Sequence, residues 1–197
     1  MSELRLYYFA MLRDPVSHFL SQYRVTSFGT VYWHFKWHCG GYTMKPPCTA
    51  HDYNNMKKVN ISTFIAGCGN WNPTLNKQTR MLGDLHLIGC KSHPTTPEEK
   101  AILLQSAKEN LLRMTGFGLT EEMGSSLKLI SHLYGIEFSP RALESSDAEG
   151  KAQVTPTVEE LELIRAANDL DLQLYAFART IFIQRLAQLN LLRLERI

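Results

Sequence analysis

The strongest constraint on the fold is an apolar, aromatic-rich run near the start of the chain that ends abruptly at a proline. Residues 4–12 read LRLYYFAML, and residues 13–15 read RDP. A nearly continuous apolar run of this length is typical of a buried strand in a parallel sheet. Asp favours helix caps and Pro favours the first helical position, so RDP is a helix-start signal. The sequence predicts a central strand over residues 4–12 and a helix over residues 16–24, with Phe19 and Tyr23 on one face.

The rest of the chain alternates helix and strand signals. Thr96, Pro97 and the two glutamates after them are a strong helix start, because a cap, a proline and early acidic side chains favour the first turn. The further predicted elements are a short helix over 76–87, strands over 116–119 and 136–138, a helix over 120–134, an exposed loop over 144–153, and an amphipathic helical stretch over 157–196 that breaks near 168–169. This order favours an α/β fold with a partly parallel sheet flanked by helices. We expect a single domain over residues 1–197, with 157–197 as its long C-terminal helical segment.

The chain contains four cysteines, an even number without the CxxC spacing of a structural zinc site. Cys39 and Cys48 bracket the Gly- and Pro-rich stretch CGGYTMKPPC, which is typical of a loop closed by a disulfide, and this leaves Cys68 and Cys90 for a second bridge. Four cysteines allow three pairings, and buried free thiols are the alternative. Asn60 begins the Asn-Ile-Ser acceptor sequence for N-glycosylation. Together these features favour a secretory compartment.

Charge is divided unevenly along the chain. Residues 1–91 hold ten Lys and Arg against four Asp and Glu, a balance of +6, whereas residues 92–197 hold eleven against fifteen, a balance of −4. A basic half beside an acidic half indicates that the first half meets an anion. No window approaches the roughly 20 apolar residues of a membrane span. Residues 1–11 lack the apolar region of a signal peptide, so the sequence as given predicts neither a leader nor an anchor.

Arg13 and Ser21 form the candidate anion site. A helix N-terminus gathers unsatisfied N–H groups and the positive end of the helix dipole. An Arg at the end of the preceding strand adds a charged donor fork suited to phosphate, and Ser21 adds a hydroxyl further along the helix. By themselves these residues also fit a capped helix with a solvated Arg. His34 and His38 have a spacing compatible with a metal on a helix, but no third ligand lies nearby, so aromatic packing or contact with an acidic glycan is the favoured interpretation.

Several stretches of the sequence resemble one family in order and spacing. They are YYFAMLRDPVSHFLSQYR, NKQTRMLGDLHLIGC, ILLQSAKENL, FGLTE and NDLDLQLYAFA, and the likeness runs from residue 7 to about residue 186. Each stretch resembles a segment of the heparan sulfate 6-O-sulfotransferases, and the first is similar to that family's 3′-phosphate-binding segment. All four cysteines fall at family cysteine positions. The chain as a whole resembles the C-terminal portion of such an enzyme.

The resemblance implies a P-loop-like sulfotransferase fold whose N-terminal part precedes the given residues. It implies an enzyme on the lumenal side of the Golgi membrane, held there by an upstream anchor. Such an enzyme moves a sulfuryl group from 3′-phosphoadenylyl sulfate (PAPS) to the 6-hydroxyl of glucosamine in heparan sulfate, without a metal. By the same resemblance, Arg13 and Ser21 hold the 3′-phosphate of PAPS. The family's Gly-rich 5′-phosphosulfate loop and its general-base His lie upstream of this segment, so the resemblance assigns no catalytic residue to this chain and predicts that it is inactive alone.

Other positions match the family less completely. Tyr32 or Trp33 stands near the family's substrate-contacting Trp, and Lys151 takes the place of an Arg in a later cofactor-binding loop. Lys77 and Arg80, within the NKQTRM stretch, are candidate contacts for a sulfated sugar. A solvated helix surface is the alternative interpretation of both side chains.

Two departures concern the segment after Arg13. Val25 stands where the family has a substrate-binding His, and His18 stands where the family usually has Arg.

The function that the resemblance implies is that of a PAPS-dependent heparan sulfate 6-O-sulfotransferase, and the alternative is a non-catalytic fragment or a glycan-binding pseudoenzyme. Heparan sulfate is the expected partner. Nucleic-acid binding is disfavoured, because nuclear domains rarely combine such cysteines with an N-glycosylation signal.

Overall fold

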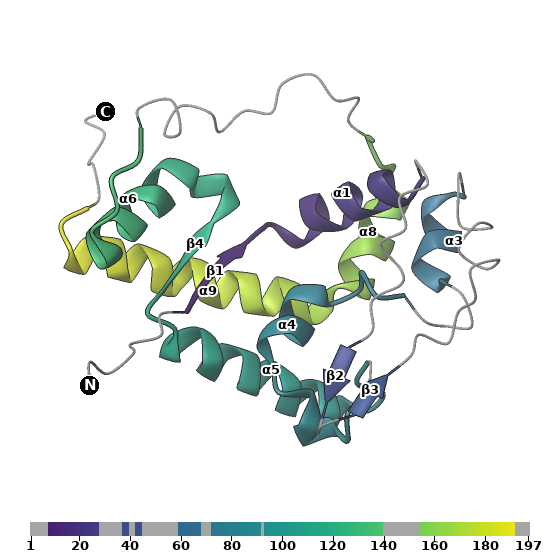
Figure 1. The fold of residues 1–197 in the computed structure, drawn as a ribbon. Helices are drawn as coiled ribbons and strands as arrows, with labels where there is room; N and C mark the ends of the chain where they lie inside the picture. Colours follow the sequence, from purple (N-terminus) through teal and green to yellow (C-terminus); the bar gives the residue numbers. More distant parts are fainter. Residues whose placement is uncertain are drawn as a thin grey trace.

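The structure of the chain, a computed structural model, describes residues 8–27, 37–39, 42–44, 59–67, 72–91, 93–139 and 154–191. Most of these residues are helical, and Figure 1 shows their arrangement. The helices and strands are β1 (Phe9–Leu12), α1 (Pro15–Ser27), β2 (Trp37–Cys39), β3 (Tyr42–Met44), α3 (Ile61–Ala66), α4 (Lys77–Leu82), η2 (Leu85–Ile88), α5 (Pro97–Arg113), β4 (Gly116–Leu119), η3 (Thr120–Glu122), α6 (Met123–Tyr134), α8 (Val158–Ala167) and α9 (Asp169–Gln188).

β1 and β4 form a parallel pair, in register from Phe9 opposite Gly116 to Leu12 opposite Leu119. This pair confirms the predicted strand over 116–119 and the predicted parallel sheet. Among the described residues no third strand joins it, so the central position predicted for the first strand is wrong there.

The predicted strand over 136–138 is also wrong. α6 ends at Tyr134 and is capped by Gly135, whose φ of 65° lies in the left-handed region that a glycine C-cap adopts readily. The chain then continues without a ladder partner, and Ile136 is 47% exposed. Alternating apolar residues such as Ile136 and Phe138 form a strand only if a second strand edge pairs with them, and no described strand does so.

The main core lies where β1 and β4 cross α9, with α5 and α6 closing its sides (Figure 1). Each strand and helix contributes apolar side chains at the spacing expected for its type. The rings of Phe117 on β4 and Phe182 on α9 are fully or almost fully buried, with centroids 6.3 Å apart. The buried members of this core are Leu12, Leu104, Ala107, Leu111, Phe117, Leu119, Leu129, Leu170, Leu174, Ala178, Phe182 and Leu186.

A second, smaller core joins α1, α3 and α8. Phe19 and Tyr23 meet Phe64 edge to face, with ring centroids 5.5 and 5.1 Å apart. The Tyr23 hydroxyl donates to the carbonyl of Val59 at 2.6 Å, and Ile164 of α8 completes the cluster. The predicted helix after RDP and its predicted face are therefore confirmed, and that face fixes α1 against α3 and α8.

The disulfide joins Cys39 to Cys90, with their Cα atoms 5.6 Å apart. The interpretation of Cys39 and Cys48 as the ends of a disulfide-closed loop is wrong. Cys39 instead ends strand β2, which pairs antiparallel with β3 so that Cys39 lies opposite Tyr42. The second predicted bridge, between Cys68 and Cys90, is also wrong, because Cys90 is bonded to Cys39. Cys48 and Cys68 lie outside the described residues.

The helix predicted over 76–87 is two shorter pieces, α4 and η2, separated at Gly83. A Cβ added at Gly83 would lie 2.6 Å from Leu103 Cδ1 and 2.9 Å from the Leu103 carbonyl oxygen, so α5 requires glycine at this close approach. The helix start at Thr96 and Pro97 is confirmed, since the Thr96 side chain caps α5. The predicted C-terminal helical stretch is confirmed from Val158 to Gln188, with its break at Asn168. Residues 144–153 and 192–197 lie outside the described part of the chain.

Candidate anion-binding site

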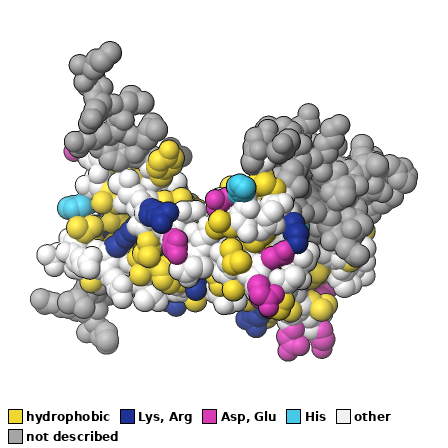
Figure 2. All heavy atoms as spheres, turned by 90° about the horizontal axis from the view of Figure 1, so that it is seen from below, with side chains coloured by type: hydrophobic (Ala, Val, Ile, Leu, Met, Phe, Trp, Pro, Cys, Tyr) yellow, Lys and Arg dark blue, Asp and Glu magenta, His cyan; other side chains and the backbone are white. Residues whose placement is uncertain are grey.

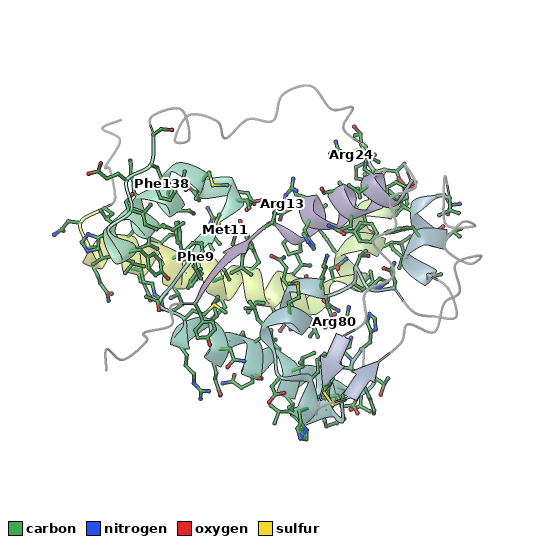
Figure 3. The ribbon with its side chains drawn as sticks, in the orientation of Figure 1. Phe9, Met11, Arg13, Arg24, Arg80 and Phe138 are labelled. Atoms are coloured by element: carbon green, nitrogen blue, oxygen red, sulfur yellow. A yellow bond between two sulfur atoms is a disulfide. The ribbon has the colours of Figure 1, made fainter. Side chains whose placement is uncertain are left out.

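Arg13 lies in the short connection between β1 and α1 (Figure 3). The side chain of Gln78 holds its backbone. The Arg13 N–H donates to Gln78 Oε1 at 2.8 Å, and Gln78 Nε2 donates to the Arg13 carbonyl at 2.9 Å. A carboxamide offers one acceptor and one donor side by side, so it can satisfy both polar atoms of one residue's backbone. The exposed side chain of Arg13 therefore projects from a fixed backbone.

Asp14 completes the turn into α1. Its Oδ1 accepts from the Ser17 N–H at 2.8 Å, which is the predicted N-cap. Its own N–H donates to Glu121 Oε1 at 3.0 Å. Glu121 Oε2 in turn accepts from the Tyr175 hydroxyl of α9 at 2.8 Å, and burial together with the Glu121 carboxylate raises the pKa of Tyr175. The start of α1 is thus tied through Glu121 to the α9 helix.

Positive charge gathers beside this turn. Burial, followed by the charges of Lys77 and Arg13, lowers the pKa of His18 to about 4. The imidazole of His18 is therefore neutral at neutral pH. Burial and then the charge of Arg80 also lower the pKa of Lys77. Two cations whose charges both lower the pKa of the same histidine form a locally electropositive surface, and such a surface is suited to an anion.

The electropositive character is local rather than general. On the face drawn in Figure 2, Lys and Arg side chains lie among Asp and Glu side chains. The described residues of that face therefore form no uniform basic surface. An anion drawn to this chain would be selected by a small group of side chains rather than by overall charge.

Arg80 turns towards the protein. Its Nη1 donates to the carbonyls of Pro73 at 3.1 Å and Leu75 at 3.4 Å. Burial lowers the pKa of Arg80 to about 10, and the nearby charge of Asp171 opposes this shift. Arg80 thereby fixes the turn that precedes α4, the helix that carries Lys77 and Gln78.

The N-termini of α4 and α9 are capped by one another's residues. Asp171 Oδ1 accepts from the Thr79 N–H and the Thr79 hydroxyl, both at 2.7 Å, and its Oδ2 accepts from the Gln78 N–H at 3.1 Å. Asn76 Oδ1 accepts from the N–H groups of Leu170 at 2.9 Å and Asp171 at 3.1 Å. These bonds satisfy orphan donors at both helix starts, so α4, although short, has a defined origin.

No protein-family model matches the chain. Among curated proteins, it is 35% identical over 192 residues to heparan-sulfate 6-O-sulfotransferase 1 of Cricetulus griseus, covering 93% of this chain and 46% of that protein. It is 35% identical over 189 residues to heparan-sulfate 6-O-sulfotransferase 1 of Homo sapiens, covering 92% and 44%, and 36% identical over 187 residues to heparan-sulfate 6-O-sulfotransferase 2 of Gallus gallus, covering 91% and 45%. The chain is homologous to the heparan-sulfate 6-O-sulfotransferases. It spans less than half the length of these relatives.

The heparan-sulfate 6-O-sulfotransferase relationship accounts for the family-like stretches, and the structure brings four of them together. RDP, NKQTR, FGLTE and NDLDLQLY meet through Gln78, Glu121 and Asp171. Ser21 lies on α1 beyond Arg13 and is partly buried. Tyr32, Trp33 and Lys151 lie outside the described residues, so their predicted roles stay predictions.

The residues that sequence reasoning missed are Gln78, Glu121 and Tyr175. All three lie inside stretches that resemble the heparan-sulfate 6-O-sulfotransferases, and that position is the one signal that could have found them. Asn60 is exposed and caps α3, since its Oδ1 accepts from the Thr63 N–H at 2.8 Å and the Ser62 hydroxyl at 2.9 Å. Its predicted glycosylation is untested.

Two classes of feature are absent from the described parts of the chain. No group of three or more His, Cys, Asp or Glu side chains there could hold a metal ion. Within the same ranges, no helix combines the length and apolar character needed to cross a membrane.

Proposed function

We propose that this chain forms part of a PAPS-dependent heparan sulfate 6-O-sulfotransferase and that Arg13 and Ser21 bind the 3′-phosphate of PAPS. PAPS would supply the sulfuryl group, and the 6-hydroxyl of glucosamine in heparan sulfate would accept it. The homology supports the family, and the coverage of less than half of each relative leaves the activity itself a proposal. The location that fits this function is the Golgi lumen.

The observation that carries the proposal is the fixed backbone beneath an exposed Arg13. Gln78 satisfies both backbone polar atoms of Arg13, and Asp14 caps α1 directly after it. A guanidinium carried on an ordered backbone just before a helix loses little backbone freedom when it binds a phosphate. Lys77 adds a second positive charge, and neutral His18 can donate or accept a hydrogen bond without adding repulsion.

The acceptor is proposed to be a sulfated glycan chain that reaches the same surface. Lys77 is the candidate contact best supported by its local electrostatics, because the pKa of His18 responds to its charge. Arg80, Tyr32, Trp33 and Lys151 remain proposed contacts to substrate or donor. A glycan attached at exposed Asn60 and the Cys39–Cys90 disulfide would both suit an enzyme that folds in the secretory pathway.

The proposal is tested by calorimetric binding of adenosine 3′,5′-bisphosphate to the 197-residue chain. Arg13→Ala removes the charged fork, and Arg113→Ala is the control, since Arg113 is exposed at the end of α5 and forms only a long ion pair with Glu109 at 3.8 Å. We expect saturable binding that Arg13→Ala weakens by roughly 10- to 100-fold and that Arg113→Ala leaves unchanged.

Two outcomes would count against the proposal. Binding unaffected by Arg13→Ala would remove Arg13 from the site. A folded chain that binds heparin but not adenosine 3′,5′-bisphosphate would favour the alternative, a non-catalytic, glycan-binding relative.

A further inference from the structure

We infer that Gln78 and Glu121 are positioning residues that hold the Arg13–Asp14 peptide group so that the Arg13 side chain is presented to its anion. This inference rests on the proposed function of Arg13. Neither residue is expected to touch the ligand, because the side chain of each is hydrogen-bonded to backbone atoms of the turn.

Two of the hydrogen bonds from Gln78 and Glu121 meet at one peptide group. The carbonyl of the Arg13–Asp14 peptide accepts from Gln78 Nε2 at 2.9 Å, and the N–H of the same peptide donates to Glu121 Oε1 at 3.0 Å. A third bond, from the Arg13 N–H to Gln78 Oε1 at 2.8 Å, holds the peptide group before it. Fixing both polar atoms of a peptide plane sets the backbone torsions on either side of it. The direction of the Arg13 side chain follows from those torsions.

Both supports are themselves anchored to α9. The N–H of Gln78 donates to buried Asp171, and Glu121 accepts from the Tyr175 hydroxyl. The supporting residues are 65 and 107 positions away from the turn in sequence, so only the tertiary fold brings them to it. A side chain that is held at its own backbone and bonded at its tip can restrain its target more firmly than a solvated one.

Loss of these restraints should appear as weaker anion binding. An unrestrained turn must lose the conformational freedom of about one residue when Arg13 binds. That cost corresponds to roughly a five- to thirtyfold increase in Kd. If Gln78 acts through Arg13, the same increase must vanish once the Arg13 side chain is removed.

The experiment is a double-mutant cycle on the full chain with adenosine 3′,5′-bisphosphate as the probe. Gln78→Met keeps the length of the side chain and removes both hydrogen bonds, while Gln105→Met is the matched control, because Gln105 is exposed on α5 and donates only to Glu109. We expect Gln78→Met to raise Kd by roughly five- to thirtyfold, with no further effect in an Arg13→Ala background. Gln105→Met should leave Kd unchanged.

A second variant pair keeps the test decisive if Gln78→Met lowers stability. Glu121→Leu removes the acceptor for the Asp14 N–H, whereas Glu121→Gln retains an acceptor oxygen at the same length. We expect Glu121→Leu to weaken binding and Glu121→Gln to restore most of it, with thermal unfolding recorded for each.

The outcomes distinguish a failure of the positioning role from a failure of the proposed function of Arg13. Wild-type binding that Arg13→Ala abolishes and that neither Gln78→Met nor Glu121→Leu alters would overturn the positioning role and leave the proposed function standing. Effects that persist undiminished in the Arg13→Ala background would also overturn it. A folded wild-type chain that does not bind the bisphosphate would overturn both.

Discussion

Asn76 and Asp171 cap each other's helices across 95 positions of sequence, Asn76 at the start of α9 and Asp171 at the start of α4. Asn76 has a φ of 46° and so occupies the left-handed region that Asn tolerates better than most residues. Asn76 and Asp171 are both buried. Each helix start therefore depends on the other helix being in place.

Asp171→Ala should destabilise the chain strongly. It would leave the Gln78 N–H, the Thr79 N–H and the Thr79 hydroxyl without their acceptor in a buried site, at a cost of about 3 kcal/mol. Asp84→Ala is the matched control, because Asp84 is exposed and caps only η2, and its loss should cost about 1 kcal/mol. Urea unfolding measures both. Equal costs for the two variants would contradict the interlocked arrangement.

The same arrangement predicts that Asn76→Ala and Asp171→Ala are not independent. Removing either residue loosens both helix starts, so the free-energy cost of the double variant should fall short of the sum of the single costs by about 1 kcal/mol or more. Unfolding of all three variants by urea gives this coupling energy. Strict additivity would show that each cap acts alone.

Stability should fall in mild acid because of His18. Its folded pKa of about 4 lies below the ordinary 6.5, so its contribution is fully present above pH 6.5 and is lost as the pH falls through about 4. The loss should reach at most about 3 kcal/mol. His18→Gln removes this titration, and His93, whose pKa burial also lowers to about 4, accounts for a separate share. Parallel pH–stability curves for wild type and His18→Gln would contradict the assignment.

The Cys39–Cys90 disulfide should contribute substantially to stability. It closes a separation of 51 residues, for which the chain-entropy model gives about 4 kcal/mol. We expect a Cys39→Ala, Cys90→Ala double variant to lose that order of free energy of unfolding. Peptide mapping without reduction should recover the Cys39–Cys90 peptide, and a Cys39–Cys48 peptide in its place would refute the pairing.

Gly118 and Gly124 should respond oppositely to alanine. A Cβ at Gly118 would meet Met11 Sδ at 2.7 Å and Ser126 Oγ at 2.8 Å, so Gly118→Ala should cost about 1–3 kcal/mol. A Cβ at Gly124, in the first turn of α6, meets nothing within 4 Å, so Gly124→Ala should stabilise the helix by about 0.5 kcal/mol. Thermal unfolding compares them, and a neutral Gly118→Ala would show that β1 and α6 can separate at this point.

Sequence reasoning succeeded where the determining contacts are local. Asp14 and Thr96 cap the helices that directly follow them, and those caps are visible in a few consecutive letters. It also identified Asn168 as a helix break, because two polar residues interrupt an apolar stripe there.

Sequence reasoning failed where the partners are distant. Nothing in the letters around Cys39 distinguishes Cys48 from Cys90, because the tertiary fold brings Cys90 to Cys39 across a separation of 51 residues. In the sequence Gln78 looks like an ordinary helix residue. Its contact with the Arg13 backbone forms only because a separate strand places Arg13 beside it. The resemblance to a family pointed to the candidate site, and the geometry shows which side chains hold the backbone of the turn there.

The dependence of Arg13 on α9 has a consequence for how the molecule is made. During synthesis the RDP turn emerges from the ribosome before Asp171 and Tyr175. These two residues anchor Gln78 and Glu121, which hold the turn. Until then Gln78 and Glu121 lack their anchors, and the turn is free to sample other geometries. The geometry of the turn should therefore be set in one late step, as α9 docks, rather than gradually as each segment emerges.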